Sequence, residues 1–259
     1  MTRNLSRMGT ALLAVALAAL LAGCPGQPRP TAGQAGQAVP APPRGNGAQR
    51  TAHLGRPYDV VASESLLTIL AYRAGALAKA GHNHVIASHD LAGTVYVPDK
   101  LGQTSVEIRI PVEGLTVDEA ALRSKEGNDF SADVPDSAKE GTRRNMLSEA
   151  LLDAAHSPEI TLAAMALDGV GEKSGTGGAN SGDLTAHLQV SVRQAKHDIL
   201  VPVHYEMKSD ELVLTGELPL KQTELGLTPF SALLGALQVQ DEMRVKFRFV
   251  ARAAPAATR

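Results

Sequence analysis

The sequence predicts a mainly β, antiparallel domain that forms a barrel or a sandwich. The first observation is that apolar and polar residues alternate with a period of two in several segments, which gives each strand one dry and one wet face. The second is that these segments, roughly eight or nine in number, are joined by many short connections. The third is that aromatic residues make up only 3% of the chain, so aliphatic side chains must supply the dry faces.

The alternation is clearest in four segments, at residues 105–112, 185–193, 201–208 and 242–248. Each places its apolar residues on one face of the strand, because successive side chains of a strand point to opposite sides. If the domain encloses a ligand, these dry faces would line the site. The candidate ligand-binding residues are Val106, Ile108, Ile110, Leu188, Val190, Val201, Val203, Val245 and Phe247.

Weaker strand signals and turn signals complete the sheet. Residues 169–182 are rich in glycine and serine and predict a flexible hairpin loop, and His197 with Asp198 is expected in a hairpin turn. No internal repeat is visible. The weaker strands are expected at residues 66–71, 84–89, 93–97, 159–167 and 211–219.

Three stretches that interrupt the strands predict helices. Thr116 and Glu119 match a capping box in front of a short helix at residues 120–122. Residues 142–155 carry an apolar stripe of helical spacing and predict a longer helix that Pro158 ends. A third helix is expected from Thr228 and Pro229 through about residue 237, because proline is favoured at the first helical position.

Residues 1–23 predict a signal peptide rather than part of the fold. Arg3 and Arg7 precede an apolar run at residues 11–22, which is too short for a membrane span of about 20 residues. The only cysteine, Cys24, follows Leu-Ala-Gly, which resembles a bacterial lipobox and implies lipidation of that thiol. The alternative is an ordinary secreted protein in which Cys24 is incidental. Pro25 stands where an aspartate would signal inner-membrane retention, so the resemblance implies the outer membrane.

A flexible tether is expected at residues 24–57. This segment holds seven of the fifteen prolines and no aromatic residue, so it cannot bury enough apolar area to offset its chain entropy. Residues 58–252 then form one domain of ordinary size, and residues 253–259 form a frayed tail.

The composition and motifs exclude several functional classes. A net charge of −2 gives no electrostatic footprint for nucleic acid, and one cysteine supports neither a disulfide framework nor a cysteine-rich zinc site. The sequence contains no G-x-S-x-G elbow, no phosphate-binding loop, no G-x-G-x-x-G after a strand and no H-E-x-x-H. We therefore predict neither an enzyme nor a bound cofactor.

A histidine cluster leaves one alternative open. On a strand, His82 and His84 would share a face about 7 Å apart, with His89 nearby. Such a pair could chelate a metal if His187 or His204 supplied a third ligand. The simpler interpretation is that these histidines bond to loops or line a polar rim. A metal-binding protein or metal-dependent enzyme built on His82, His84 and His89 is the alternative function.

The order of these features resembles the YceI-like family of bacterial envelope proteins. Residues 81–84 with 91–95 are similar to the family's second strand, and residues 144–147 with 156–162 to its helix and the strand after it. Residues 184–203 and 223–226 are similar to its later strands and turn. Aliphatic residues replace several of the family's aromatics. The resemblance implies a lipocalin-like antiparallel β-barrel of about eight strands with one to three short helices.

The same resemblance implies a function. Members of the family bind polyisoprenoids and similar amphiphiles, so this chain is expected to hold an isoprenoid, a quinone or another amphiphilic lipid in its barrel. Together with the lipobox, this implies a lipid-anchored protein on the periplasmic side of the cell envelope. The expected partners are the lipid ligand and a membrane reached through the N-terminal lipid, and no nucleic acid.

Overall fold

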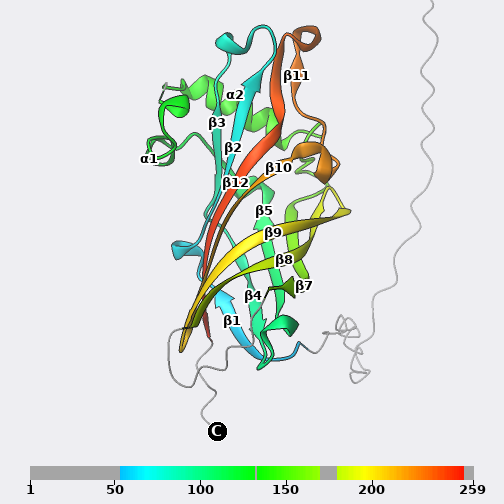
Figure 1. Ribbon diagram of the computed structural model, residues 1–259. Coiled ribbons are helices and arrows are strands. Elements are labelled where there is room, and N and C mark those ends of the chain that lie inside the picture. The colour runs from blue at the N-terminus through cyan, green and yellow to red at the C-terminus, as the bar shows by residue number, and fades with distance from the viewer. Residues whose placement is uncertain (1–52, 132, 170–179, 254–259) are drawn as a thin grey trace, which may run out of the picture. The chain divides into compact units, whose positions relative to one another are not determined.

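The computed structural model describes residues 53–131, 133–169 and 180–253. The expected signal peptide, Cys24, tether residues 24–52, loop residues 170–179 and tail residues 254–259 lie outside the described residues. Twelve strands and two α-helices follow one another along the chain, joined by turns and short 3-10 segments (Figure 1). The helices are α1 (Ala120–Arg123) and α2 (Asp136–Leu147). The strands are β1 (Arg56–Val60), β2 (Leu66–Ala74), β3 (His84–Ser88), β4 (Ala92–Val97), β5 (Ser105–Pro111), β6 (Thr116–Val117), β7 (Glu159–Asp168), β8 (Asn180–Val192), β9 (Ala195–Lys208), β10 (Glu211–Lys221), β11 (Ser231–Ala232) and β12 (Leu237–Ala253).

Eight of the strands close into an antiparallel barrel. Their order is β1-β4-β5-β7-β8-β9-β10-β12, and β12 pairs back onto β1 through Tyr58 opposite Ala253 and Val60 opposite Ala251. Closure gives the backbone groups at both edges of the sheet a partner, so the barrel has no exposed edge strand. The predicted fold class, an antiparallel barrel of about eight strands with few helices, is confirmed.

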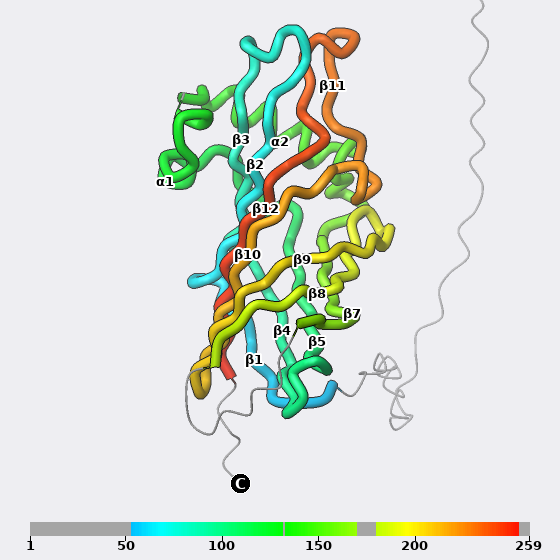
Figure 2. Tube along the Cα trace, in the orientation of Figure 1, coloured from blue at the N-terminus to red at the C-terminus, as the bar shows by residue number. Residues whose placement is uncertain are grey.

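The sheet divides into two branches at one level. Three long chain segments each break there: between β1 and β2 at residues 61–65, between β3 and β4 at 89–91, and between β5 and β6 at 112–115. On one side of the breaks, β5 pairs with β7 and completes the barrel. On the other side, β2, β3 and β6 extend from the far half of β12, and α2 packs against β6 (Figure 2). We call the closed ring the lower barrel and the second branch with α2 the upper compartment.

The longer predicted helix is displaced. The structure places α2 at Asp136–Leu147, six residues earlier than the predicted start, and it ends where Ser148 adopts an extended backbone with ψ of 161°. The chain then folds into turns, in which the amide of Ala154 donates to the carbonyl of Leu147. Met146 and Ala154 of the predicted apolar stripe are buried, but Ala154 lies in the turns rather than in a helix. Leu152, which was not part of that stripe, is buried in the same turns.

Three other predictions of local structure are wrong. The expected helix at residues 229–237 is instead the β11–β12 hairpin, in which Ser231 pairs with Gln238. The expected capping box fails because Glu119 itself precedes α1 and makes no side-chain cap, although the Thr116 hydroxyl does bond to the Glu119 carboxylate. His197 and Asp198 lie within β9, and the hairpin turns four residues earlier at Arg193 and Gln194, both with positive φ. That geometry matches the twist of the flanking strands.

The sheet extends slightly beyond the predicted domain. β1 begins at Arg56, so two residues of the expected tether pair with β4, and β12 continues to Ala253. The four clear strands and the five weaker ones all form. The strands β1, β6 and β11 were not expected. No helix within the described ranges is long and apolar enough to cross a membrane.

Candidate functional site

The lower barrel encloses an apolar cavity of about 200 Å³. One water molecule needs only roughly 15 Å³ on the same measure, so this is a hollow rather than a packing defect. Apart from Thr104, every residue that lines it is hydrophobic, and Tyr205, Phe247 and Phe249 are its only aromatics. All nine candidate ligand-binding residues predicted from the sequence line this cavity: Val106, Ile108, Ile110, Leu188, Val190, Val201, Val203, Val245 and Phe247.

The upper compartment encloses a larger cavity of about 450 Å³ with a mixed lining. Its walls come from β2, β3, α2, the turns after α2 and the first half of β12. Its polar lining includes two kinds of basic side chain, arginine and histidine, and contains no aspartate or glutamate. An anionic or neutral polar group would therefore contact no carboxylate in this lining. The polar lining residues are Arg73, His82, His84, Thr142, Asn145, Gln222 and Gln238.

The two cavities adjoin at a ring of shared residues, which we call the waist. Each of these side chains borders both cavities, so the two cavities are neighbours separated by this layer of side chains. All of these shared residues are apolar, so the polar lining residues of the upper cavity lie outside the waist. The waist residues are Leu67, Ile69, Ile110, Ile160, Val190, Leu225 and Met243.

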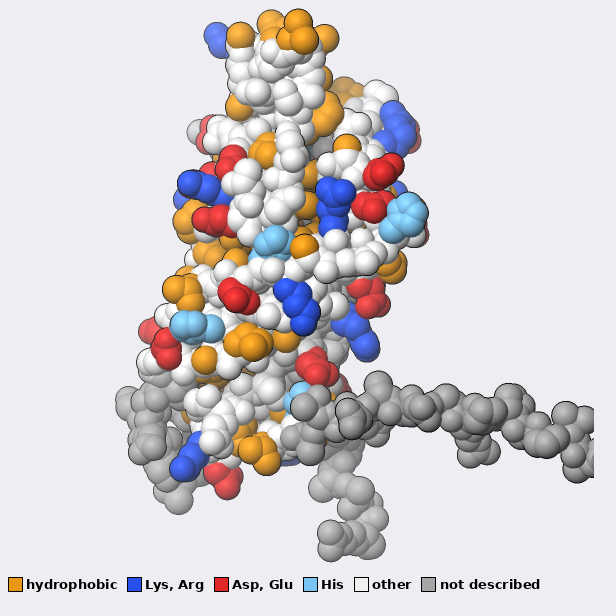
Figure 3. All heavy atoms as spheres, turned by 90° about the vertical axis from the view of Figure 1, so that its right-hand side faces the viewer, with side chains coloured by type: hydrophobic (Ala, Val, Ile, Leu, Met, Phe, Trp, Pro, Cys, Tyr) orange, Lys and Arg blue, Asp and Glu red, His pale blue; other side chains and the backbone are white. Residues whose placement is uncertain are grey.

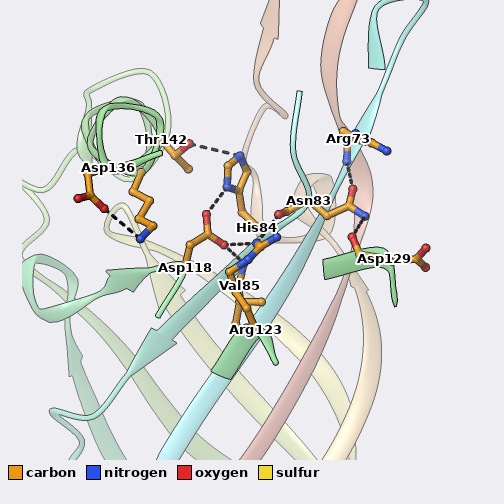
Figure 4. A network of polar contacts seen from close by, with 10 residues as sticks. Arg73, Asn83, His84, Val85, Asp118, Arg123, Asp129, Asp136 and Thr142 are labelled. Carbon is orange, nitrogen blue, oxygen red and sulfur yellow. Dashed lines mark hydrogen bonds and ion pairs between the residues drawn. The ribbon is translucent and has the colours of Figure 1, made fainter. Parts of the chain in front are cut away.

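A buried polar network holds His84 in the wall of the upper compartment (Figure 4). His84 Nδ1 lies 2.6 Å from Asp118 Oδ2, and its Nε2 lies 3.3 Å from the hydroxyl of Thr142 on α2. Because an ionised carboxylate only accepts hydrogen bonds, the proton of this pair sits on Nδ1. The imidazole therefore connects the sheet to the helix that covers it.

Asp118 is the centre of this network. Its side chain is 0% exposed, and Oδ1 accepts hydrogen bonds from the amide of Val85 at 2.9 Å and from Arg123 Nη1 at 2.5 Å. Burial raises the pKa of the Asp118 carboxyl, but the bonds from His84, Val85 and Arg123 lower it further, and the net pKa lies below its ordinary value. The carboxylate is therefore charged at neutral pH, and Arg123, itself 8% exposed, compensates that charge.

Asn83 links the same network to the rim of the cavity. Arg123 donates to the backbone carbonyl of Asn83 at 2.7 Å. The side chain of Asn83 accepts a hydrogen bond from the amide of Arg73 at 3.0 Å and donates one to the carbonyl of Asp129 at 3.0 Å (Figure 4). Arg73 Nη1 also donates to the carbonyl of Gly81 at 2.7 Å. These bonds fix the segment before β3, and with it the position of His82.

The structure does not assemble the three histidines into a metal site. The rings of His82 and His84 lie 6.3 Å apart, and both border the upper cavity. His89 is exposed and bonds instead to Glu119 at 2.9 Å. His187 and His204, the possible third ligands, pair with Asp168 and Asp183 at exposed positions. Across the described ranges, no three histidine, cysteine or acidic side chains come together in a way that could hold a metal ion.

Sequence reasoning missed Asp118 and Arg123. In the sequence they lie beside the expected capping box and give no signal of burial. Asp118 is 34 residues from its partner His84, and only the pairing of β3 with β6 brings the two together. Its positive φ of 57° follows from its place directly after β6, where the chain turns into α1.

Together these features define a class of protein: a closed antiparallel β-barrel with an apolar interior that opens into a polar compartment. The YceI-like domain family matches residues 58–251, and the chain belongs to this family.

Two solved structures share the fold. BcnA from Burkholderia cenocepacia is 16% identical and superposes with a TM-score of 0.51, over 74% of this chain and 99% of that one. A polyisoprenoid-binding domain from Saccharophagus degradans is 10% identical, also with a TM-score of 0.51, over 76% of this chain and 98% of that one. A search among curated proteins found no match.

Proposed function

We propose that this protein binds an isoprenoid or another amphiphilic lipid, with the apolar chain in the lower barrel and the polar end in the upper compartment. The observation that carries the proposal is the pair of adjoining cavities, one almost wholly apolar and one with a polar lining. That gradient matches the chemistry of a molecule with a long apolar tail and a small polar head.

The energetics favour such a ligand. Burial of apolar surface gains about 25 cal/mol per Å², so burying a few hundred Å² of a flexible chain outweighs much of the cost of ordering it. The lower barrel offers aliphatic side chains on every wall, and such a lining is less shape-selective than an aromatic one. The likeness to a polyisoprenoid-binding domain from Saccharophagus degradans supports the same class of ligand.

The polar end would lie among Arg73, His82, His84 and Asn145. Arg73 and Asn145 are exposed, so this part of the cavity is open to the surface. In the described part of the chain, His82 has no hydrogen-bond partner, and its ring nitrogens are available to a ligand. A quinone carbonyl, a hydroxyl or a phosphate could accept hydrogen bonds from Arg73, His82 and Asn145.

We further propose that the protein acts in the cell envelope, held to a membrane through lipidated Cys24 and a tether of about thirty residues. The lipobox-like sequence before Cys24 supports this proposal. Binding, rather than catalysis, is the proposed activity, because an apolar cavity needs no reactive group to hold a lipid.

Ligand binding is tested with two matched tryptophan substitutions on neighbouring strands. Leu188 lines the lower cavity, whereas Leu200 is 60% exposed and lies next to it in the β8–β9 register, opposite His187. Leu188→Trp fills the cavity, and Leu200→Trp adds the same ring outside it. Organic extracts of the purified full chains are examined by mass spectrometry, and each chain is melted with and without a polyprenol or a prenylated quinone.

We expect the parent chain and Leu200→Trp to yield lipid extracts and to gain melting temperature with a ligand, and Leu188→Trp to show neither effect. The proposal fails if the parent chain is reproducibly empty and neither ligand shifts its melting temperature. It also fails if Leu188→Trp, while still folded, binds as tightly as the parent chain.

A further inference from the structure

Two loops meet at the free end of the upper compartment. One is residues 75–81, between β2 and β3, and the other is residues 233–236, between β11 and β12 (Figure 1). They are tied together, because the amide of Leu77 donates to the carbonyl of Ala236 at 2.7 Å. We call these two loops the tip. It lies at the end of the fold opposite to β1 (Figure 1).

The tip exposes large apolar side chains. Leu77 is 46% exposed, Leu233 67% and Leu234 fully exposed at 109%. The described residues contain six large hydrophobic residues of this exposure, and half of them are here. Figure 3 shows hydrophobic side chains gathered at this end. Contiguous exposed apolar side chains at a protruding end indicate a contact surface rather than ordinary surface leucines.

The backbone holds two of these leucines in an unfavourable conformation. Leu233 and Leu234 have φ of 52° and 54°, a region that is uncommon for residues other than glycine and asparagine. A glycine or asparagine would form this turn with less strain. The local cost brings no packing in return, because both side chains point into solvent. A strained position with an exposed apolar side chain is typical of a functional site.

The charge of the tip matches one kind of partner. Its two loops contain one ionisable residue, Lys79, and no acidic residue. Exposed leucines beside a single lysine suit the surface of a bilayer, where the leucines enter the acyl region and the ammonium stays among the phosphates. The basic residue Arg73 is exposed nearby on β2, which extends the cationic character of this end.

We infer that the tip docks onto a lipid bilayer, with Leu77, Leu233 and Leu234 inserted into its interface. The tip adjoins the upper cavity directly, because Ala80 and Gly81 from one loop and Leu237 beside the other line it. Docking would place the polar mouth at the depth of the lipid headgroups, where an amphiphile can pass between bilayer and barrel. The inference goes beyond the proposed function, since the tip can dock whether or not the cavity holds a lipid.

A fluorescent reporter tests insertion at single positions. Cys24 is the only cysteine, so a full chain with Cys24→Ser accepts a thiol-reactive, environment-sensitive dye at one introduced site. Leu234→Cys places the dye on the tip, and Leu200→Cys places it on an exposed strand position outside the tip. Both chains are mixed with vesicles of phosphatidylethanolamine and phosphatidylglycerol, with and without brominated acyl chains.

We expect the dye at position 234 to shift to shorter wavelength and to be quenched by the brominated lipid, while the dye at position 200 changes in neither respect. Because both chains carry the same N-terminal segment, any membrane affinity of that segment acts equally on both. No shift and no quenching at position 234 would overturn the inference. A shift that occurs without vesicles and grows with protein concentration would also overturn it, and would assign the tip to self-association.

Substitutions measure the contribution of each group. Leu233→Ser and Leu77→Ser should each weaken partitioning of the dye-labelled chain to vesicles roughly tenfold, and Lys79→Glu should weaken it about fivefold or more on anionic vesicles. Met165→Ser, at an exposed residue on β7, is the matched control and should change nothing. Equal effects of the tip and control substitutions would contradict insertion through the tip.

Discussion

The lower barrel and the upper compartment are two parts of one sheet, but different structural elements close their walls. In the lower barrel, eight strands complete each other's hydrogen bonds, and their dry faces converge on an apolar cavity. In the upper compartment, β6 ends one branch of the sheet, and α2 with a buried His84–Asp118–Arg123 network completes the wall.

The difference shows where polar chemistry can enter a barrel. In the lower barrel the inward-facing positions are almost all apolar, and Thr104 is the one polar residue in the lining of its cavity among the described residues. The polar side chains of the upper cavity lie on β2, β3, α2 and the start of β12, and in the segments before β3 and after β10. They form the polar end of the amphiphilic gradient on which the proposed function depends.

The largest expected effect is on the buried ion pair. Asp118→Ala removes the carboxylate that lies 2.5 Å from the guanidinium of buried Arg123 and should lower the free energy of unfolding by about 3–5 kcal/mol, as measured by urea denaturation. Asp136→Ala is the control, because its side chain is 92% exposed and its one ion pair among the described residues is with Lys139. It should change stability by less than about 1 kcal/mol. Equal small losses for both variants would mean that the network does not hold the upper compartment.

Acid should remove part of the same stability. Since the folded-state pKa of Asp118 lies below its unfolded value, its contribution is complete above the unfolded pKa of about 4 and is lost as the pH falls through the folded pKa. Thermal unfolding of the parent chain and of Asp118→Asn should therefore converge as the pH is lowered from 7 to below 4. If the difference between the two stays constant over this range, the charge of Asp118 does not contribute.

A substitution at the waist should separate the two cavities. Val190 borders both of them, and Val190→Phe should reduce stability by about 1–3 kcal/mol through overpacking. It should also favour short isoprenoids over long ones, which competition between farnesol and a long polyprenol would measure. Gln189→Phe, on the neighbouring position of β8, is the control for the added ring. Unchanged chain-length preference in Val190→Phe would show that a ligand does not span the waist.

The smallest expected effect is at the contact between the sheet and α2. Thr142→Val removes the hydroxyl that faces His84 Nε2 and should cost about 1 kcal/mol. The loss should be local, so hydrogen exchange should quicken in α2 and not in the lower barrel. Thr185→Val on β8, whose hydroxyl has no hydrogen-bond partner in the described part of the chain, should leave exchange in both regions unchanged.

The sequence predicted the lower barrel well and the upper compartment poorly. All nine candidate ligand-binding residues on the four clear strands line the lower cavity, because period-two alternation indicates which residues share one face of a strand. The upper compartment was predicted poorly. The helix at 142–155 was displaced, the helix at 229–237 is a hairpin, and Asp118 gave no signal. Turns and short helices carry no comparable periodicity, and their conformation depends on partners that are distant in the sequence.

The sequence by itself therefore determined the antiparallel class, the family and the apolar character of the barrel interior. Local alternation fixes these properties, because a strand exposes one face to each side regardless of its neighbours. The tertiary structure alone decided that the interior is hollow, that the sheet divides at one level, and that Asp118 and Arg123 are buried beside His84. Those features arise from pairings between segments tens of residues apart, and a single strand or turn contains no information about the partner that it will meet.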